Sequence, residues 1–159
     1  MTEYDLEGIG ITDDRAELFN VASSPPEQAG EQRLFTRMSP PGWLLAFWQE
    51  IDDKSWGAGF DCLAEDAVCN LGVADWHGRE AIRANLRAFV DTGFTAHHDV
   101  LEYWDSPRLK IFRGQVRMTP DAAGQPVVTP TMTHFFYMDD ADPTKVSRWY
   151  GAVGPVAFG

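Results

Sequence analysis

The spacing of apolar residues predicts three helices in the first half of the chain. Trp43, Phe47 and Ile51 recur every four residues, which places them on one face of a helix. The same spacing predicts a short second helix over 56–63 and a longer third helix over 79–90.

The period of the pattern changes to two after residue 93, which predicts strands. Four strands are expected over 94–104, 109–119, 127–138 and 146–153, after an earlier short strand at 67–72. Short turns rich in Asp, Pro and Gly separate the four, and such connections favour antiparallel pairing. Helices that precede an antiparallel sheet indicate an α+β fold. We expect a cone-shaped, curved antiparallel sheet wrapped over the three helices, with a pocket between sheet and helices.

The first 40 residues differ from the remainder of the chain. They hold eight acidic and only three basic residues, and Ser-Ser-Pro-Pro at 23–26 ends a possible helix over 13–21. We interpret 1–40 as an acidic N-terminal arm and 41–159 as a single α+β domain. The arm either wraps the domain or a partner subunit, or is a disordered tail.

Composition narrows the range of partners. The chain has 159 residues, about the size of one domain, and its 24 acidic and 13 basic residues give a net charge of −11. This charge argues against nucleic acid and anionic membrane surfaces as partners. With no apolar run near the roughly 20 residues of a membrane span, and no signal-peptide pattern, we expect a cytoplasmic protein. Cys62 and Cys69 are expected to be buried thiols.

Four segments share a likeness to known proteins: IDDKSWGAGFDCLAEDAVCNLG (51–72), WHGREAIRANL (76–86), FTAHHDVLEYW (94–104) and VSRWYGAVGP (146–155). Together they resemble the nuclear-transport-factor-2-like superfamily, in its small-enzyme branch of polyketide-cyclase-like (SnoaL-like) domains and scytalone dehydratase. The resemblance covers about 43–155 and implies the cone fold and a homodimer through the outer sheet face. The superfamily contains enzymes, binding modules and transport factors, so the fold leaves the function open.

A pair of histidines marks the first of the four strands. Neighbours on a strand point to opposite faces, so only one of His97 and His98 can enter the pocket, and no metal site is indicated. The mostly apolar alternate positions 94, 96 and 100 assign His98 to the inside.

The resemblance gives His98 a partner. Scytalone-dehydratase-like proteins have a histidine at the position of His98 and an aspartate at that of Asp52, which hydrogen-bonds the histidine and makes it a better base. Such a dyad can act as a general base near neutral pH. The alternative is structural: Asp52 caps the second helix, and His98 is a core histidine.

Other family signatures are missing. The second dehydratase histidine is replaced by Pro120, and the dehydratase tyrosines by Ile51 and Leu71. Ketosteroid-isomerase-like members need a carboxylate and a tyrosine where this chain has Leu71 and Phe47. Limonene-epoxide-hydrolase-like members need an Arg-x-Asp, and the nearest match, Arg-Gly-Gln at 113–115, lacks the acid.

Strand alternation predicts the rest of the pocket. The residues expected to bind substrate are Trp56, Leu71, Val100, Val116, Met118, Thr131 and Thr133. Those expected on the outer face are Arg113, Gln115 and Arg117, and also His134 and Phe136, which would contribute to the dimer.

These observations predict a small-molecule lyase or isomerase of the dehydratase, cyclase or double-bond isomerase type. The substrate of this enzyme would be an apolar cyclic or polyketide-like molecule. Asp52 and His98 would form the general base of the enzyme, and no cofactor or metal is implied. The alternatives are a non-catalytic small-molecule-binding or dimerisation module, or an epoxide hydrolase with an atypical site. The enzyme differs from the non-catalytic alternative in one observation: Asp52 and His98 must be within hydrogen-bond reach, and both must face a cavity.

Overall fold

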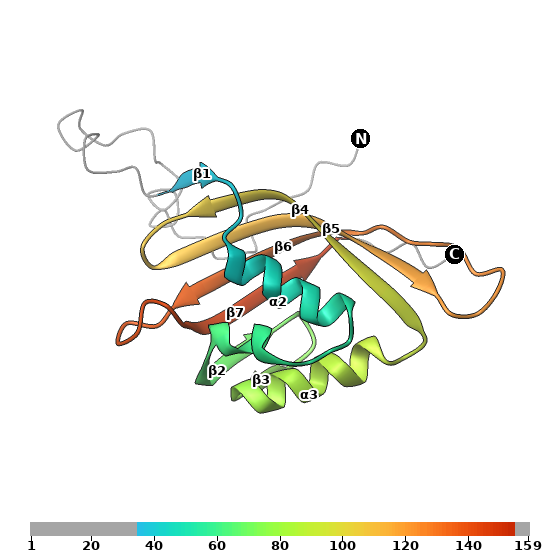
Figure 1. Ribbon diagram of the computed structural model, residues 1–159, viewed down its shortest axis with the longest axis horizontal. Coiled ribbons are helices and arrows are strands. Elements are labelled where there is room, and N and C mark those ends of the chain that lie inside the picture. Colours follow the sequence, from blue (N-terminus) through green and yellow to red (C-terminus); the bar gives the residue numbers. More distant parts are fainter. Residues whose placement is uncertain (1–34, 155–159) are drawn as a thin grey trace, which may run out of the picture. The chain divides into compact units, whose positions relative to one another are not determined.

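A curved sheet dominates the computed structural model, which describes residues 35–154. Its seven strands lie in the order β1-β4-β5-β6-β7-β2-β3 (Figure 1). Their bounds are β1 Thr36–Met38, β2 Leu63–Asn70, β3 Asp75–His77, β4 Phe94–Asp105, β5 Leu109–Pro120, β6 Thr131–Met138 and β7 Val146–Val153. Neighbouring strands are antiparallel except β2 and β7, which are parallel. Since β1 and β3 are edges, the sheet is not closed into a barrel.

The helices lie on one side of this sheet (Figure 1). Helix α2 (Gly42–Asp52) buries Leu44, Phe47, Trp48 and Ile51, and α3 (Arg79–Val90) buries Ile82, Leu86 and Val90. The second of the three expected helices is a short 3₁₀ turn, η3 (Ala58–Cys62). Its sequence contains Gly59 and is preceded by Gly57, and glycine disfavours a regular helix. The α+β cone expected from the sequence is therefore confirmed, with two α-helices in the described part.

The faces of β6 are opposite to those expected. Met132, His134 and Phe136 are buried, whereas Thr131 is exposed and Thr133 is half-buried. The reason is the register: Thr131 pairs with Gln115 and Thr133 with Arg113, and paired residues share a face of the sheet. Gln115 and Arg113 belong to the outward set, as predicted. The assignments of Thr131 and Thr133 to the pocket, and of His134 and Phe136 to the outer face, were therefore wrong.

Two boundaries also differ from the expected ones. Strand β6 begins at Thr131 instead of 127, because Pro130 has no N–H to donate to a ladder. Strand β1 falls inside the segment interpreted as an arm and pairs with the end of β4. The remainder of that segment, including the possible helix over 13–21, lies outside the described residues.

Both cysteines are free thiols, Cys69 buried and Cys62 half-buried. Burial raises the pKa of the Cys62 thiol to about 12 and raises that of Cys69 as well. None of the helices in the described part of the chain is long and apolar enough to cross a membrane.

Candidate active site

Asp52 and His98 meet where the end of α2 reaches the middle of β4. Asp52 Oδ1 lies 2.5 Å from His98 Nδ1, and Asp52 Oδ2 accepts the backbone N–H of His98 at 2.9 Å. Both side chains are only 9% exposed. One carboxylate therefore holds the imidazole ring and the backbone of the same residue, which fixes the orientation of the ring.

This contact also fixes the tautomer of His98. A carboxylate accepts hydrogen bonds, so the Nδ1 of a neutral His98 carries the proton and its Nε2 keeps a free lone pair. Trp48 stacks on the imidazole, with ring centroids 4.4 Å apart and planes inclined by 22°. The arrangement is that of an oriented base.

His97 lies on the other side of the same strand. Its side chain is 62% exposed, and its Nδ1 is 3.5 Å from Asp52 Oδ2 and its Nε2 3.4 Å from Asp99. The expectation that only one of the two histidines enters the pocket is confirmed.

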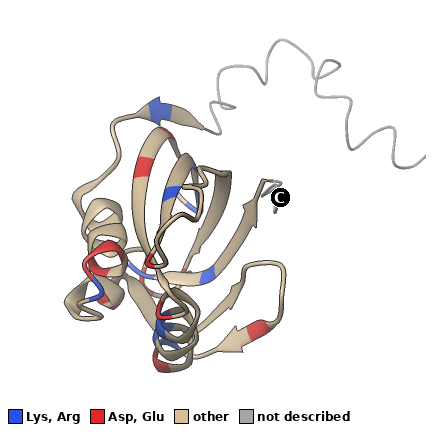
Figure 2. Ribbon diagram, turned by 90° about the vertical axis from the view of Figure 1, so that its right-hand side faces the viewer, with Lys and Arg blue, Asp and Glu red and all other residues tan. Residues whose placement is uncertain are grey.

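His98 lines a cavity of about 280 Å³ between α2, α3 and the inner face of the sheet. None of the side chains on its wall is a Lys, Arg, Asp or Glu, and aliphatic and aromatic groups form most of it. In the described part, the Lys, Arg, Asp and Glu positions are scattered over the helices, strands and turns (Figure 2). Asp52 does not line the cavity and reaches it only through His98, so the expectation that both residues face the cavity was wrong for Asp52.

The structure brings some of the expected pocket residues to this cavity. Leu71, Val116 and Met118 line it together with His98. Val100 packs against the core just before a bulge in β4, and Trp56 packs against Phe60 with ring centroids 6.0 Å apart. Neither residue lines the cavity.

The sequence reasoning missed His134, which is 3% exposed and also lines the cavity. The indole N–H of Trp149 donates to its Nδ1 at 2.9 Å. Burial, and secondarily the nearby His98, lower the pKa of His134 to about 3, so this imidazole is neutral at ordinary pH. The sequence offered no decisive signal, because the inward position of His134 follows from its pairing with the buried Phe112, which only the structure shows.

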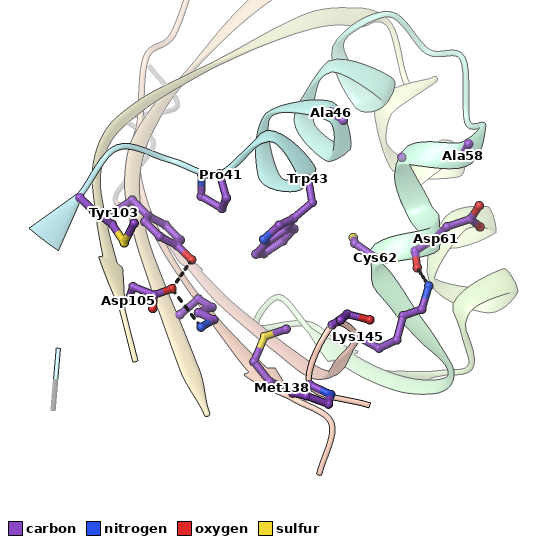
Figure 3. Close-up of a pocket in the computed structure, with 15 residues that line it drawn as sticks. Pro41, Trp43, Ala46, Ala58, Asp61, Cys62, Tyr103, Asp105, Met138 and Lys145 are labelled. Atoms are coloured by element: carbon purple, nitrogen blue, oxygen red, sulfur yellow. Dashed lines mark hydrogen bonds and ion pairs between the residues drawn. The ribbon is translucent and has the colours of Figure 1, made fainter. Parts of the chain in front are cut away.

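A larger hollow, of about 570 Å³, lies beside the start of α2 (Figure 3). Its polar groups are occupied with one another: the Tyr103 hydroxyl donates to Asp105 Oδ1 at 2.9 Å, and Lys110 Nζ lies 2.9 Å from the same oxygen. Lys145 Nζ donates to the backbone carbonyl of Asp61 at 2.5 Å. Because these contacts already pair Tyr103, Lys110 and Asp105 with one another, and the other cavity holds the oriented His98, the cavity at His98 is the stronger candidate.

Two other chemistries find little support in the described residues. No group of three or more His, Cys, Asp or Glu side chains within 35–154 could hold a metal ion. Arg113, the only part of the epoxide-hydrolase signature present, points outward and pairs with Glu102 at 2.8 Å.

Comparison with solved structures supports the fold. The chain is similar to an M. tuberculosis epoxide hydrolase of the limonene-epoxide-hydrolase-like type, with 13% identity, a TM-score of 0.57, and coverage of 70% of this chain and 79% of the other. It is also similar to a Catenulispora acidiphila protein with a ketosteroid-isomerase-like fold, solved in complex with trimethylamine, with 13% identity, a TM-score of 0.60 and coverage of 71% and 85%.

A protein from Shewanella denitrificans assigned as a SnoaL-like polyketide cyclase is a third such structure, with 10% identity, a TM-score of 0.58 and coverage of 70% and 87%. Identities this low establish a shared fold and no shared activity. No curated protein matches the chain. The family model of the SnoaL-like domain matches residues 44–144, and the chain therefore belongs to the SnoaL-like domain family.

Proposed function

We propose that this protein is a small-molecule lyase or isomerase in which Asp52 and His98 form the general base. The observation that carries the proposal is the 2.5 Å contact between Asp52 Oδ1 and His98 Nδ1, made by a histidine that lines an apolar cavity. SnoaL-like relatives assigned as polyketide cyclases are consistent with it.

The proposed chemistry starts with proton removal from carbon. His98 Nε2 takes a proton from the carbon next to a substrate carbonyl, and the C–H electron pair becomes the new C=C bond of an enolate. Asp52 stabilises the imidazolium that forms, because its carboxylate already contacts Nδ1. His98 then returns the proton to another carbon in an isomerisation, or to a departing hydroxyl in a dehydration.

The cavity limits the substrate. Its volume of about 280 Å³ is at the small end of ligand pockets, and its wall offers mainly apolar contact. A compact cyclic molecule with few polar groups fits this description best. Exclusion of water by the same wall strengthens the Asp52–His98 interaction.

The first experiment is a screen of small cyclic ketones, hydroxy-ketones and epoxides, followed by variants assayed on the best substrate. His98→Ala and Asp52→Asn should each reduce kcat by roughly 10²–10⁴-fold, the range of a general base. His77→Ala, at an exposed histidine on β3, is the matched control and should keep the wild-type rate.

Three results would contradict the proposal: full activity of His98→Ala, full activity of Asp52→Asn, or tight ligand binding without turnover across the screen. The last result would favour a non-catalytic binding protein. Turnover of epoxides alone would favour an epoxide hydrolase in which the dyad activates water. Thermal unfolding of each variant shows whether a lost rate reflects chemistry or a lost fold.

A further inference from the structure

Two buried N–H groups of the cavity wall have no hydrogen-bond partner among the described residues. They belong to Trp48 (Nε1) and His134 (Nε2), whose side chains are 4% and 3% exposed. Buried polar atoms almost always have a partner, and an unmet donor costs free energy. Two such atoms in residues that line one cavity leave two hydrogen-bonding groups that a bound molecule can satisfy.

The tautomer of His134 shows that its free nitrogen is a donor. The indole N–H of Trp149 can only donate, so His134 Nδ1 accepts this bond and carries no proton. A neutral imidazole has one proton, which must then be on Nε2. His134 is thus held in the tautomer opposite to that of His98.

The two donors lie beside the proposed base. The Trp48 ring stacks on His98 at 4.4 Å between centroids and lies 5.0 Å from the His134 ring. Trp48 therefore packs against both histidines. The rings that carry the base and the two donors therefore pack against one another in the wall of one cavity.

We propose that Trp48 Nε1–H and His134 Nε2–H together bind the carbonyl oxygen of an enolisable ketone. This inference rests on the proposed function and names its substrate class. A carbonyl oxygen has two lone pairs and no proton, so it can accept from both groups at once, whereas a hydroxyl would bring a further donor. When His98 removes the α-proton, the C=O π pair moves onto this oxygen, and the two N–H groups stabilise the charge.

The test uses 2-tetralone, labelled with ¹³C at the carbonyl, and tetralin as the probe of similar shape without the oxygen. Binding is measured by calorimetry, the carbonyl stretching band by infrared difference spectroscopy, and α-proton exchange in D₂O by NMR. Wild-type protein should prefer the ketone and shift its carbonyl band to lower frequency. Loss of one donor should weaken ketone binding roughly three- to tenfold, leave tetralin binding unchanged and partly reverse the band shift.

Three variants separate the donor from the packing. His134→Asn keeps an acceptor for Trp149 and loses the Nε2–H, whereas His134→Gln places an amide N–H near the position of Nε2 and should restore part of the affinity. Trp48→Phe keeps a ring on His98 and loses the indole N–H. If substitution of His134 prevents folding, Trp48→Phe carries the test alone.

The proposed function can fail separately from this inference. His98→Ala should abolish α-proton exchange while the ketone still binds with its shifted band. Equal affinity of the wild type for ketone and tetralin, including no binding of either, would overturn the donor pair and point to an ordered water at these atoms. An unshifted carbonyl band, or wild-type ketone affinity in Trp48→Phe and His134→Asn, would overturn it too.

Discussion

His98 and His134 line the same cavity, but their hydrogen-bond partners give the two side chains different chemical roles. The Nδ1–H of His98 donates a hydrogen bond to the carboxylate of Asp52, whereas the Nδ1 of His134 accepts a hydrogen bond from the indole N–H of Trp149. The first ring is left with a lone pair at Nε2 and the second with an N–H. Identical side chains thus become a base and a hydrogen-bond donor.

The buried neutral His134 predicts a specific pH dependence of stability. An unfolded histidine binds a proton below pH 6.5, but the folded pKa of about 3 keeps His134 neutral between these values. The unfolded state then binds more protons, so the free energy of unfolding falls as pH falls through this window. His134→Gln, which cannot be protonated, should lose less stability than wild type between pH 7 and pH 4.

Urea unfolding of both proteins at several pH values measures this difference. Parallel curves of unfolding free energy against pH would show that His134 is protonated in the folded state as readily as in the unfolded chain.

At the scale of elements, the packing of β6 against β7 depends on a glycine, which has no side chain. Gly151 pairs with His134, and a Cβ atom at this position would lie only 2.4 Å from His134 Nδ1 and 2.8 Å from Leu71 Cδ2. The buried imidazole therefore needs glycine opposite it. Strands β6 and β7 thus position His134, whereas the end of α2 positions His98.

Gly151→Ala should accordingly destabilise the protein by about 1–3 kcal/mol through overpacking, and should disturb the bond between Trp149 and His134. The measurements are urea unfolding and binding of 2-tetralone. Gly42→Ala is the control, since a Cβ there meets nothing within 4 Å. Unchanged stability and binding in Gly151→Ala would mean that β6 and β7 move apart at little cost.

At the scale of the whole molecule, the observed orientation of β6 changes which residues are expected to form the dimer surface. A row of half-buried apolar side chains crosses the outer face on paired positions of adjacent strands: Trp104, Ile111, Phe135 and Tyr150. This outer row takes the place of His134 and Phe136, which point inward. We propose that a homodimer forms through it.

Sedimentation equilibrium tests this proposal. Phe135→Glu places a charge in the middle of the outer row and should convert a dimer into a monomer at micromolar concentration. Val73→Glu is the control, because Val73 is 87% exposed in the turn between β2 and β3, away from the row. A monomeric wild type at that concentration, or a dimeric Phe135→Glu, would show that the row is not the interface.

Local patterns of apolar residues were enough to predict several helices and strands correctly. Helices α2 and α3 and strands β4 and β5 follow from periods of four and two, because each buries one face against the same core. The resemblance placed Asp52 and His98 together, and the structure has them in contact. The inward positions of Val116 and Met118 followed from alternation alone.

Features that depend on the pairing between strands could be seen only in the folded chain. Both alternating sets of β6 contain apolar residues, so alternation could not tell which set faces inward; the register with β5 turned His134 in and Thr133 out. Strands β1 and β3 have three residues each, too few to show an alternating pattern. They are recognised as strands by their pairing with β4 and β2. The donor pair arises in the same way, because Trp48 and His134 come from elements far apart in sequence, and the proton on His134 is placed by Trp149 on the neighbouring strand.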